Sequence, residues 1–264
     1  MNTDPHEFIH QNRRAWNEIA GVRSKTFPPA EFFAGGGCTL SKRIIEAAQL
    51  SPPQSPHSVI HLQCATGEDT LSWAGLGADA YGVDLSELQV DIANQKARDA
   101  GLGARFAAAD VYQLPGALPA DWPAQYDRVF TGGGALVWLP DITRWAKIVA
   151  GLLKPGGRLV LEDIHPVSAI LWEVDGRIEF VGDYFSRGQG EASTGWTHFK
   201  GGEDAREVRY EFNWPLGDIV TALARAGLVI ERLEEFPGGP AYRFHEKLED
   251  SMRLPCDFLL TARK

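Results

Sequence analysis

Strand-like and helix-like segments alternate between residues 58 and 163, and this alternation restricts the fold more than any other feature of the chain. Strand-like runs lie at 58–62, 80–84, 105–108, 126–131 and 158–162. Helix-like segments separate several of them, at 69–77, 86–100 and 141–153. Strands that alternate with helices at this spacing are typical of βαβ units, so we expect a parallel sheet covered by helices.

The last hundred residues have a different texture. Two alternating stretches, 177–181 and 207–212, predict an antiparallel pair of strands. A helix is expected to start near Leu216 and to end before Gly227. Strands at 228–233 and 257–262 are then expected to complete the main sheet.

Composition excludes several classes of function. With 26 basic and 35 acidic residues the formal net charge is −9, which disfavours a nucleic-acid partner. Cys38, Cys64 and Cys256 are too few and too scattered for a disulfide framework or a zinc site, and they indicate a reducing cytoplasm. No apolar run approaches ~18 residues, so no membrane span is expected. The sequence therefore predicts a cytoplasmic globular protein, and it does not specify the number of subunits.

The segment from His61 to Ser86 carries the strongest indication of a ligand site. A strand runs into the turn at 63–67, a helix begins near Asp69, and a second strand ends at Asp84. Ligands bind beyond the carboxyl ends of such strands, and a carboxylate after the second strand can accept hydrogen bonds from ribose hydroxyls. The unit predicts a site for an adenosine-containing cofactor; the alternative is a βαβ turn without a ligand.

The residues of the turn distinguish between cofactors. A dinucleotide site uses three glycines, G-x-G-x-x-G, whereas this turn has one, Gly67. Glu68 and Asp69 lie where a pyrophosphate would need neutral or positive surroundings. Acids are tolerated there by a cofactor that carries a sulfonium and an ammonium. The turn therefore favours S-adenosyl-L-methionine, and an NAD-dependent oxidoreductase is kept as the alternative.

These motifs resemble those of the class I S-adenosylmethionine-dependent methyltransferases, and the resemblance covers residues 59–163. The first motif of the family corresponds to 59–67, its ribose-binding acid to Asp84, and its adenine-contacting acid to Asp110. Its later motifs correspond to 126–132 and 153–159. A narrower resemblance, to bacterial proteins of small-molecule type, rests on HLQC in the first motif and on the run GGGALVWLPD.

The resemblance implies a fold and an activity. The fold would be an α/β, Rossmann-like three-layer sandwich, whose seven-stranded, mostly parallel sheet has an antiparallel last strand and carries a small cap. The activity would be methyl transfer from S-adenosyl-L-methionine to an O, N or C nucleophile of a small, aromatic or apolar molecule. Alternatives are a non-catalytic cofactor-binding module and a methyltransferase of RNA or protein, although the net charge argues against RNA.

Site residues follow from the same correspondence, with departures. His61 replaces the usual acid, and Gln63 and Ala65 replace two usual glycines. Because Gln63 does not easily adopt positive φ, we expect either a different turn or a contact between its amide and the cofactor. The predicted cofactor contacts are Trp16, Gln63, Cys64, Ala65, Gly67, Thr70, Asp84, Leu85, Asp110, Val111, Thr131 and Gly132.

The resemblance also implies a division of the chain. Residues 1–57 would form an N-terminal helical lid, with Trp16 closing over the cofactor and a linker at 51–56. Residues 58–264 would form the methyltransferase domain, with a substrate-cap insert at about 165–214. Several of the eight tryptophans fall in the lid and insert, where aromatic walls suit a planar or apolar substrate.

His165 is the candidate general base. It follows the fifth strand, and an imidazole there could take a proton from the nucleophile. The alternative is a structural histidine. Glu162 and Asp163 are expected to be strand-end or turn carboxylates. Methyl transfer from a sulfonium needs alignment and exclusion of water more than a base. No His, Asp or Glu pair has metal-ligand spacing, so no metal is expected.

Overall fold

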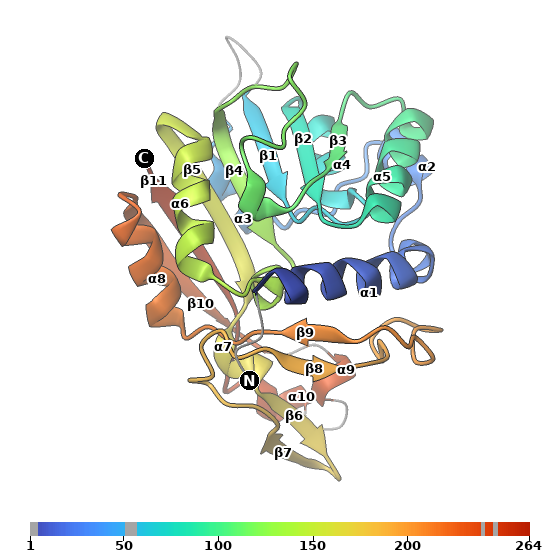
Figure 1. Ribbon diagram of the computed structural model, residues 1–264, viewed down its shortest axis with the longest axis vertical. Helices are drawn as coiled ribbons and strands as arrows, with labels where there is room; N and C mark the ends of the chain where they lie inside the picture. The colour runs from blue at the N-terminus through green and yellow to red at the C-terminus, as the bar shows by residue number, and fades with distance from the viewer. Residues whose placement is uncertain (1–4, 51–56, 239–240, 245–247) are drawn as a thin grey trace.

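A seven-stranded sheet forms the centre of the computed structural model, which describes residues 5–50, 57–238, 241–244 and 248–264 (Figure 1). The order of strands across it is β10-β11-β5-β4-β1-β2-β3. Strand β11 is antiparallel to both its neighbours, and the remaining adjacent pairs are parallel. The predicted sheet is thus confirmed, while the predicted linker at 51–56 lies outside the described residues.

The strands of this sheet follow the predicted segments closely. In chain order they are β1 (Ser58–Leu62), β2 (Asp79–Asp84), β3 (Arg105–Ala108), β4 (Tyr126–Gly132), β5 (Leu153–Ile164), β10 (Val229–Pro237) and β11 (Pro255–Arg263). Every residue of β1 is buried, as in a parallel strand that is covered on both faces.

Helices cover both faces of the sheet. One face carries α6 (Ile142–Leu152) and α8 (Leu216–Arg225), and the other carries α3 (Lys42–Ala48), α4 (Glu68–Gly75) and α5 (Glu87–Ala100). Ser86 caps α5 by accepting the Gln89 N–H, and Gly101 ends it with a φ of 66°. The three predicted layers are therefore confirmed.

Short elements connect these layers. They are α2 (Ala30–Ala34), the 3₁₀ turns η1 (Val111–Gln113) and η2 (Leu136–Trp138), α7 (Pro166–Ala169), α9 (Ala241–Phe244) and α10 (Leu248–Ser251). The turn η2 lies in the loop after β4, and η1 lies in the loop after β3. Both loops therefore leave the sheet at its carboxyl edge.

The insert contains two small sheets of its own. Strand β6 (Leu171–Val174) pairs with β7 (Arg177–Phe180), and β8 (Glu191–Ser193) pairs with β9 (Arg209–Glu211). The predicted pairing of 177–181 with 207–212 is therefore wrong. Asp175 and Gly176, with φ of 49° and 71°, close a two-residue hairpin between β6 and β7, and Asp-Gly is the strongest local signal for such a turn.

Helix α1 (Pro5–Thr26) lies between the main sheet and the β8–β9 pair (Figure 1). Asn12 joins it to β9: its Nδ2 donates to the Tyr210 carbonyl at 2.9 Å, and its Oδ1 accepts the Tyr210 N–H at 2.7 Å. On the sheet side, Asn17 Oδ1 accepts the Ser86 hydroxyl at 2.6 Å. The helix is thus bonded to both halves of the molecule.

Candidate functional site

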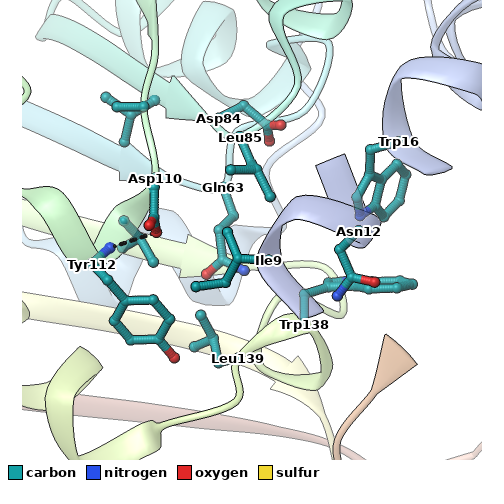
Figure 2. A pocket seen from close by; sticks show the side chains of 13 residues that line it. Ile9, Asn12, Trp16, Gln63, Asp84, Leu85, Asp110, Tyr112, Trp138 and Leu139 are labelled. Carbon is teal, nitrogen blue, oxygen red and sulfur yellow. Dashed lines mark hydrogen bonds between the residues drawn. The ribbon is translucent and has the colours of Figure 1, made fainter. Parts of the chain in front are cut away.

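An open pocket of about 560 Å³, counting the part open to solvent, lies between α1 and the carboxyl ends of β1, β2 and β3 (Figure 2). Of the predicted contacts, Trp16, Gln63, Asp84, Leu85, Asp110 and Val111 line it. The other lining residues, which the sequence did not single out as contacts, are Ile9, Asn12, Val83, Ala109, Tyr112, Trp138 and Leu139.

Asp84 ends β2 and is buried. Its Oδ2 accepts the Ala65 N–H at 2.7 Å, and its Oδ1 accepts the Ser86 N–H at 2.9 Å. Burial raises the pKa of the Asp84 carboxyl, and these two backbone donors limit the rise. Each carboxylate oxygen has further acceptor capacity, so the group can still accept hydroxyl donors from the pocket.

The turn after β1 takes left-handed backbone conformations without the usual glycines. Gln63, Ala65 and Gly67 have φ of 58°, 48° and 87°. Gln63 thus holds the positive φ that a residue with a Cβ adopts less easily than glycine, and the different turn that was one of the two expectations is not seen. Its side-chain Nε2 donates to the Ala135 carbonyl at 2.8 Å, which links the turn to the loop after β4. At Gly67 a Cβ would lie 2.8 Å from that of Ala93, so only glycine fits there.

Asp110 stabilises the loop after β3. Its Oδ1 accepts the Tyr112 N–H at 2.9 Å and so caps η1 (Figure 2). The Tyr112 hydroxyl donates to the Asp141 carbonyl at 3.0 Å and accepts the Asp141 N–H at 2.9 Å, which fixes the ring in the wall of the pocket. Tyr112 directly follows the predicted contacts Asp110 and Val111, and this adjacency in sequence could have indicated that Tyr112 also lines the pocket.

Six of the predicted contacts do not line the pocket: Cys64, Ala65, Gly67, Thr70, Thr131 and Gly132. The buried Cys64 Sγ would lie 2.8 Å from a Cβ at Gly82, so it packs beneath the turn. Thr70 is fully buried with its hydroxyl 3.0 Å from His61 Nδ1, and burial lowers the pKa of that imidazole to about 3. These two side chains therefore support the turn from behind.

His165 is held as a helix cap rather than presented to the pocket. It is 3% exposed, its Nδ1 accepts the Val167 N–H at 3.1 Å, and its Nε2 lies 2.9 Å from Glu235 Oε1. Burial lowers the pKa of this imidazole below its usual value. The structure thus does not bring the predicted base to the pocket, because both ring nitrogens face protein groups on the far side of β5.

Asp163 holds the loop that follows β4. Its buried carboxylate accepts N–H groups from Gly134 at 2.6 Å, Leu136 at 2.8 Å and Ile164 at 2.7 Å. Burial raises the pKa of Asp163 to about 6 in spite of these donors. It therefore acts as the turn carboxylate that the sequence predicts.

A buried ionic network joins α1 to the turn after β1. Glu68, 4% exposed, lies between Arg23 of α1 and Lys96 of α5. Burial alone would raise the pKa of Glu68, but the two cations hold it below its usual value. Arg23 also donates to the Thr66 hydroxyl. Glu68 is therefore paired with two cations, and neither Glu68 nor Asp69 lines the pocket, so the acidic surroundings that the sequence predicted for the cofactor are not provided by these two residues.

Within 5–50, 57–238, 241–244 and 248–264, no group of three or more His, Cys, Asp or Glu side chains is arranged to hold a metal ion. Over the same ranges, no helix is both long enough and apolar enough to cross a membrane.

Known sequences match the part of the chain that builds this pocket. Residues 59–157 match a family described as "Methyltransferase domain". A methyltransferase of Streptomyces halstedii named GfsG is 28% identical over 135 residues, 50% of this chain and 45% of that protein. A ubiquinone biosynthesis O-methyltransferase of Xanthomonas euvesicatoria is 31% identical over 111 residues, 42% of this chain and 44% of that protein. The chain thus spans less than half the length of these relatives.

Solved structures match over more of the chain. An S-adenosylmethionine-dependent methyltransferase from Mesorhizobium loti is 26% identical, with a TM-score of 0.59 over 83% of this chain and 96% of that chain. A geranyl diphosphate C-methyltransferase from Streptomyces coelicolor, solved with S-adenosyl-L-homocysteine, is 14% identical, with a TM-score of 0.56 over 84% of this chain and 77% of that chain. At that identity the second likeness concerns the fold alone.

Proposed function

We propose that the chain is a class I S-adenosylmethionine-dependent methyltransferase and that it transfers the sulfonium methyl group of S-adenosyl-L-methionine to an oxygen, nitrogen or carbon nucleophile of a small organic molecule. The relative named for ubiquinone biosynthesis supports a small, largely apolar acceptor. The pocket wall agrees with such an acceptor, because Ile9, Trp138 and Leu139 contribute apolar surface to it.

One observation carries the proposal: two carboxylates from neighbouring strands, Asp84 and Asp110, line a single pocket beside the turn after β1. An adenosine group offers ribose hydroxyls and an exocyclic amine, which are donors that match two carboxylates. Leu85 and Val111 supply apolar contact for the base between them. We therefore assign the ribose to Asp84 and the adenine amine to Asp110.

S-adenosyl-L-methionine, when bound, supplies a methyl carbon that is already activated by a positively charged sulfur. The chain then has to align the nucleophile and exclude water. The Trp16 and Trp138 rings, whose centroids are 4.9 Å apart, close the α1 side of the pocket. Asp163 fixes the loop after β4, at the sheet edge next to the turn. No base is assigned here, since His165 is engaged elsewhere.

We also propose that residues 1–57 act as a lid and that the insert at about 165–214 covers the substrate. Helix α1 supplies Ile9, Asn12 and Trp16 to the pocket wall. The same helix is bonded to β9 of the insert through Asn12. A motion of α1 away from the sheet would widen the pocket for exchange of the cofactor, and it would carry β9 with it.

Calorimetric titration with S-adenosyl-L-homocysteine and with NAD⁺ tests the proposal. Micromolar binding of the homocysteine compound alone is expected. Asp84→Ala should weaken it about 100-fold, because it removes a charge-assisted acceptor and the support of the Ala65 N–H. Asp91→Ala, an exposed aspartate on α5, is the matched control and should bind like the wild type.

Other outcomes would redirect the assignment. Binding of NAD⁺ alone would indicate an oxidoreductase. Tight binding of the homocysteine compound without methyl transfer to a panel of aromatic and apolar alcohols, amines and acids would indicate a non-catalytic binding module. Release of S-adenosyl-L-homocysteine in the presence of one panel member is the expected result.

A further inference from the structure

The carboxamide of Gln63 has one bonded end and one unpartnered end. Its Nε2 donates to the Ala135 carbonyl at 2.8 Å. Its Oε1 is buried and has no hydrogen-bond partner among the residues that the structure describes. The side chain also lines the pocket next to Asp84 and Asp110 (Figure 2). A buried acceptor without a donor is rare in native proteins and needs an explanation.

The orientation of this amide is fixed by its surroundings. If the amide were flipped, Oε1 would face the Ala135 carbonyl oxygen, and two acceptors would oppose each other. Gln63 also holds φ at 58°, a conformation that glycine adopts more easily. Two unfavourable features thus occur together at one residue of the pocket, which indicates a function for the side chain there.

The position of Gln63 on the sheet identifies the group that its oxygen would meet. Asp110 follows β3, Asp84 ends β2 and Gln63 follows β1, and these three strands are neighbours in that order. Adjacent strands lie about 4.8 Å apart, so the three acceptors form a row along the carboxyl edge of the sheet. In S-adenosyl-L-methionine the hydrogen-bond donors follow the same order: adenine amine, ribose hydroxyls, and then the α-ammonium of the methionine part.

We propose that Gln63 Oε1 accepts a hydrogen bond from the α-ammonium of S-adenosyl-L-methionine. This inference rests on the proposed function, and it names the side-chain atom that meets the amino-acid part of the cofactor. A neutral amide suits the position chemically. It binds the ammonium through a dipole, whereas a carboxylate would also stabilise the nearby sulfonium charge, whose loss drives methyl transfer.

Three ligands with different amino-acid parts test the assignment by calorimetry. S-adenosyl-L-homocysteine has the ammonium and the carboxylate, its decarboxylated analogue has the amine alone, and 5′-methylthioadenosine has neither. Gln63→Met, which keeps the length of the side chain and removes the amide, should weaken the first two ligands by about 10- to 100-fold, as expected for a lost hydrogen bond to a charged group. Its affinity for 5′-methylthioadenosine should stay within about twofold of the wild-type value, since that ligand has no ammonium.

Each other result overturns the assignment. Parallel weakening of all three ligands would mean that Gln63 acts through the shape of the turn. Unchanged affinity for all three would mean that Oε1 does not meet the cofactor. If Gln63→Met fails to fold in a thermal unfolding assay, Gln63→Gly makes the same comparison, because glycine suits a φ of 58°. Failure of the wild type to bind S-adenosyl-L-homocysteine would instead refute the proposed function.

Discussion

The main sheet and the insert differ in how their strands pair and in how deeply their side chains are buried. In the sheet, seven strands form a continuous ladder, and Phe130 of β4 is 1% exposed. In the insert, two separate pairs of short strands are formed, and Phe180 of β7 is 79% exposed. The sheet side of the pocket is therefore fixed by long-range packing, whereas the insert side depends on local turns and on its contacts with α1.

Polar groups make the junction between these two regions. At the carboxyl-terminal half of α1, Arg23 is bonded to the turn after β1. Nearer its amino terminus, Asn12 is bonded to β9, and Glu18 accepts the Arg206 and Glu207 N–H groups. Because directional bonds of this kind break individually, the junction can be tested one residue at a time, while the core of the sheet responds as a unit.

The largest effect is expected in the sheet. Phe130 packs between His61 and Trp73, with ring centroids 4.7 and 5.5 Å away. Phe130→Ala should lower the free energy of unfolding by about 3–5 kcal/mol, because it leaves a cavity between β4 and α4. Urea denaturation measures this loss. Phe130→Leu, which fills most of the space, should lose much less, and a loss below about 1 kcal/mol for Phe130→Ala would contradict the contrast with the insert.

Asp163 of the sheet and His198 of the insert should also respond to pH with opposite sign. The pKa of Asp163 is raised to about 6 by burial, above its unfolded value near 3.9, so its contribution to stability is full below pH 4 and is lost as pH rises through 6. In the insert, burial lowers the pKa of His198 to about 4, so its contribution is present above pH 6.5 and is lost as pH falls toward 4.

Unfolding curves between pH 4 and 7 check these signs. Relative to Asp163→Asn, the wild type should lose about 3 kcal/mol of stability between pH 4 and pH 7. Relative to His198→Gln, the wild type should lose stability in the opposite direction, as pH falls from 6.5 to 4. A difference curve for Asp163→Asn that is flat over this range would show that the carboxyl is not buried as described.

Sequence patterns predicted the sheet well for a physical reason. The completely buried β1 is mostly apolar, and a strand that ends at a ligand edge ends in a polar residue, as β2 does at Asp84. Both features are written locally in the chain. The Asp175-Gly176 hairpin is also encoded locally, whereas the alternation of polar and apolar residues in 177–181 and 207–212 does not specify which strands pair with each other.

Sequence patterns predicted only the wall of the pocket that the strand ends form, because the other wall comes from α1. Gln63, Asp84 and Asp110 follow strands, and the parallel sheet alone brings them together. Ile9 and Asn12 reach the same pocket from α1, whose position is set by contacts with residues about 200 positions away. Such contacts leave no periodic signal. Conversely, Thr70 and Cys64 lie close to the turn in sequence yet face away from the pocket.

An intermediate effect is expected at the junction. Asn12 is 2% exposed and satisfies both backbone groups of Tyr210. Asn12→Ala should cost about 2 kcal/mol, because it leaves an N–H and a carbonyl of β9 without their partner. Amide hydrogen exchange should rise at 209–211 and stay unchanged in β1. Arg14→Ala removes an exposed ion pair with Glu207 and serves as the control, with an expected cost below about 1 kcal/mol. Equal exchange in the two variants would contradict the proposed role of Asn12.

The smallest effect is expected at the hairpin of the insert, where the same residue type as in the first test is exposed. Phe180→Ala should change the free energy of unfolding by less than about 0.5 kcal/mol, since a side chain that is 79% exposed buries little apolar surface on folding. Affinity for S-adenosyl-L-homocysteine should not change, because β7 contributes no residue to the pocket wall. A larger loss of stability that grows with protein concentration would mean that another copy of the chain covers the hairpin. In that case Phe180 would be exposed in the single chain but buried in an oligomer, and the contrast with the buried Phe130 would apply to the single chain alone.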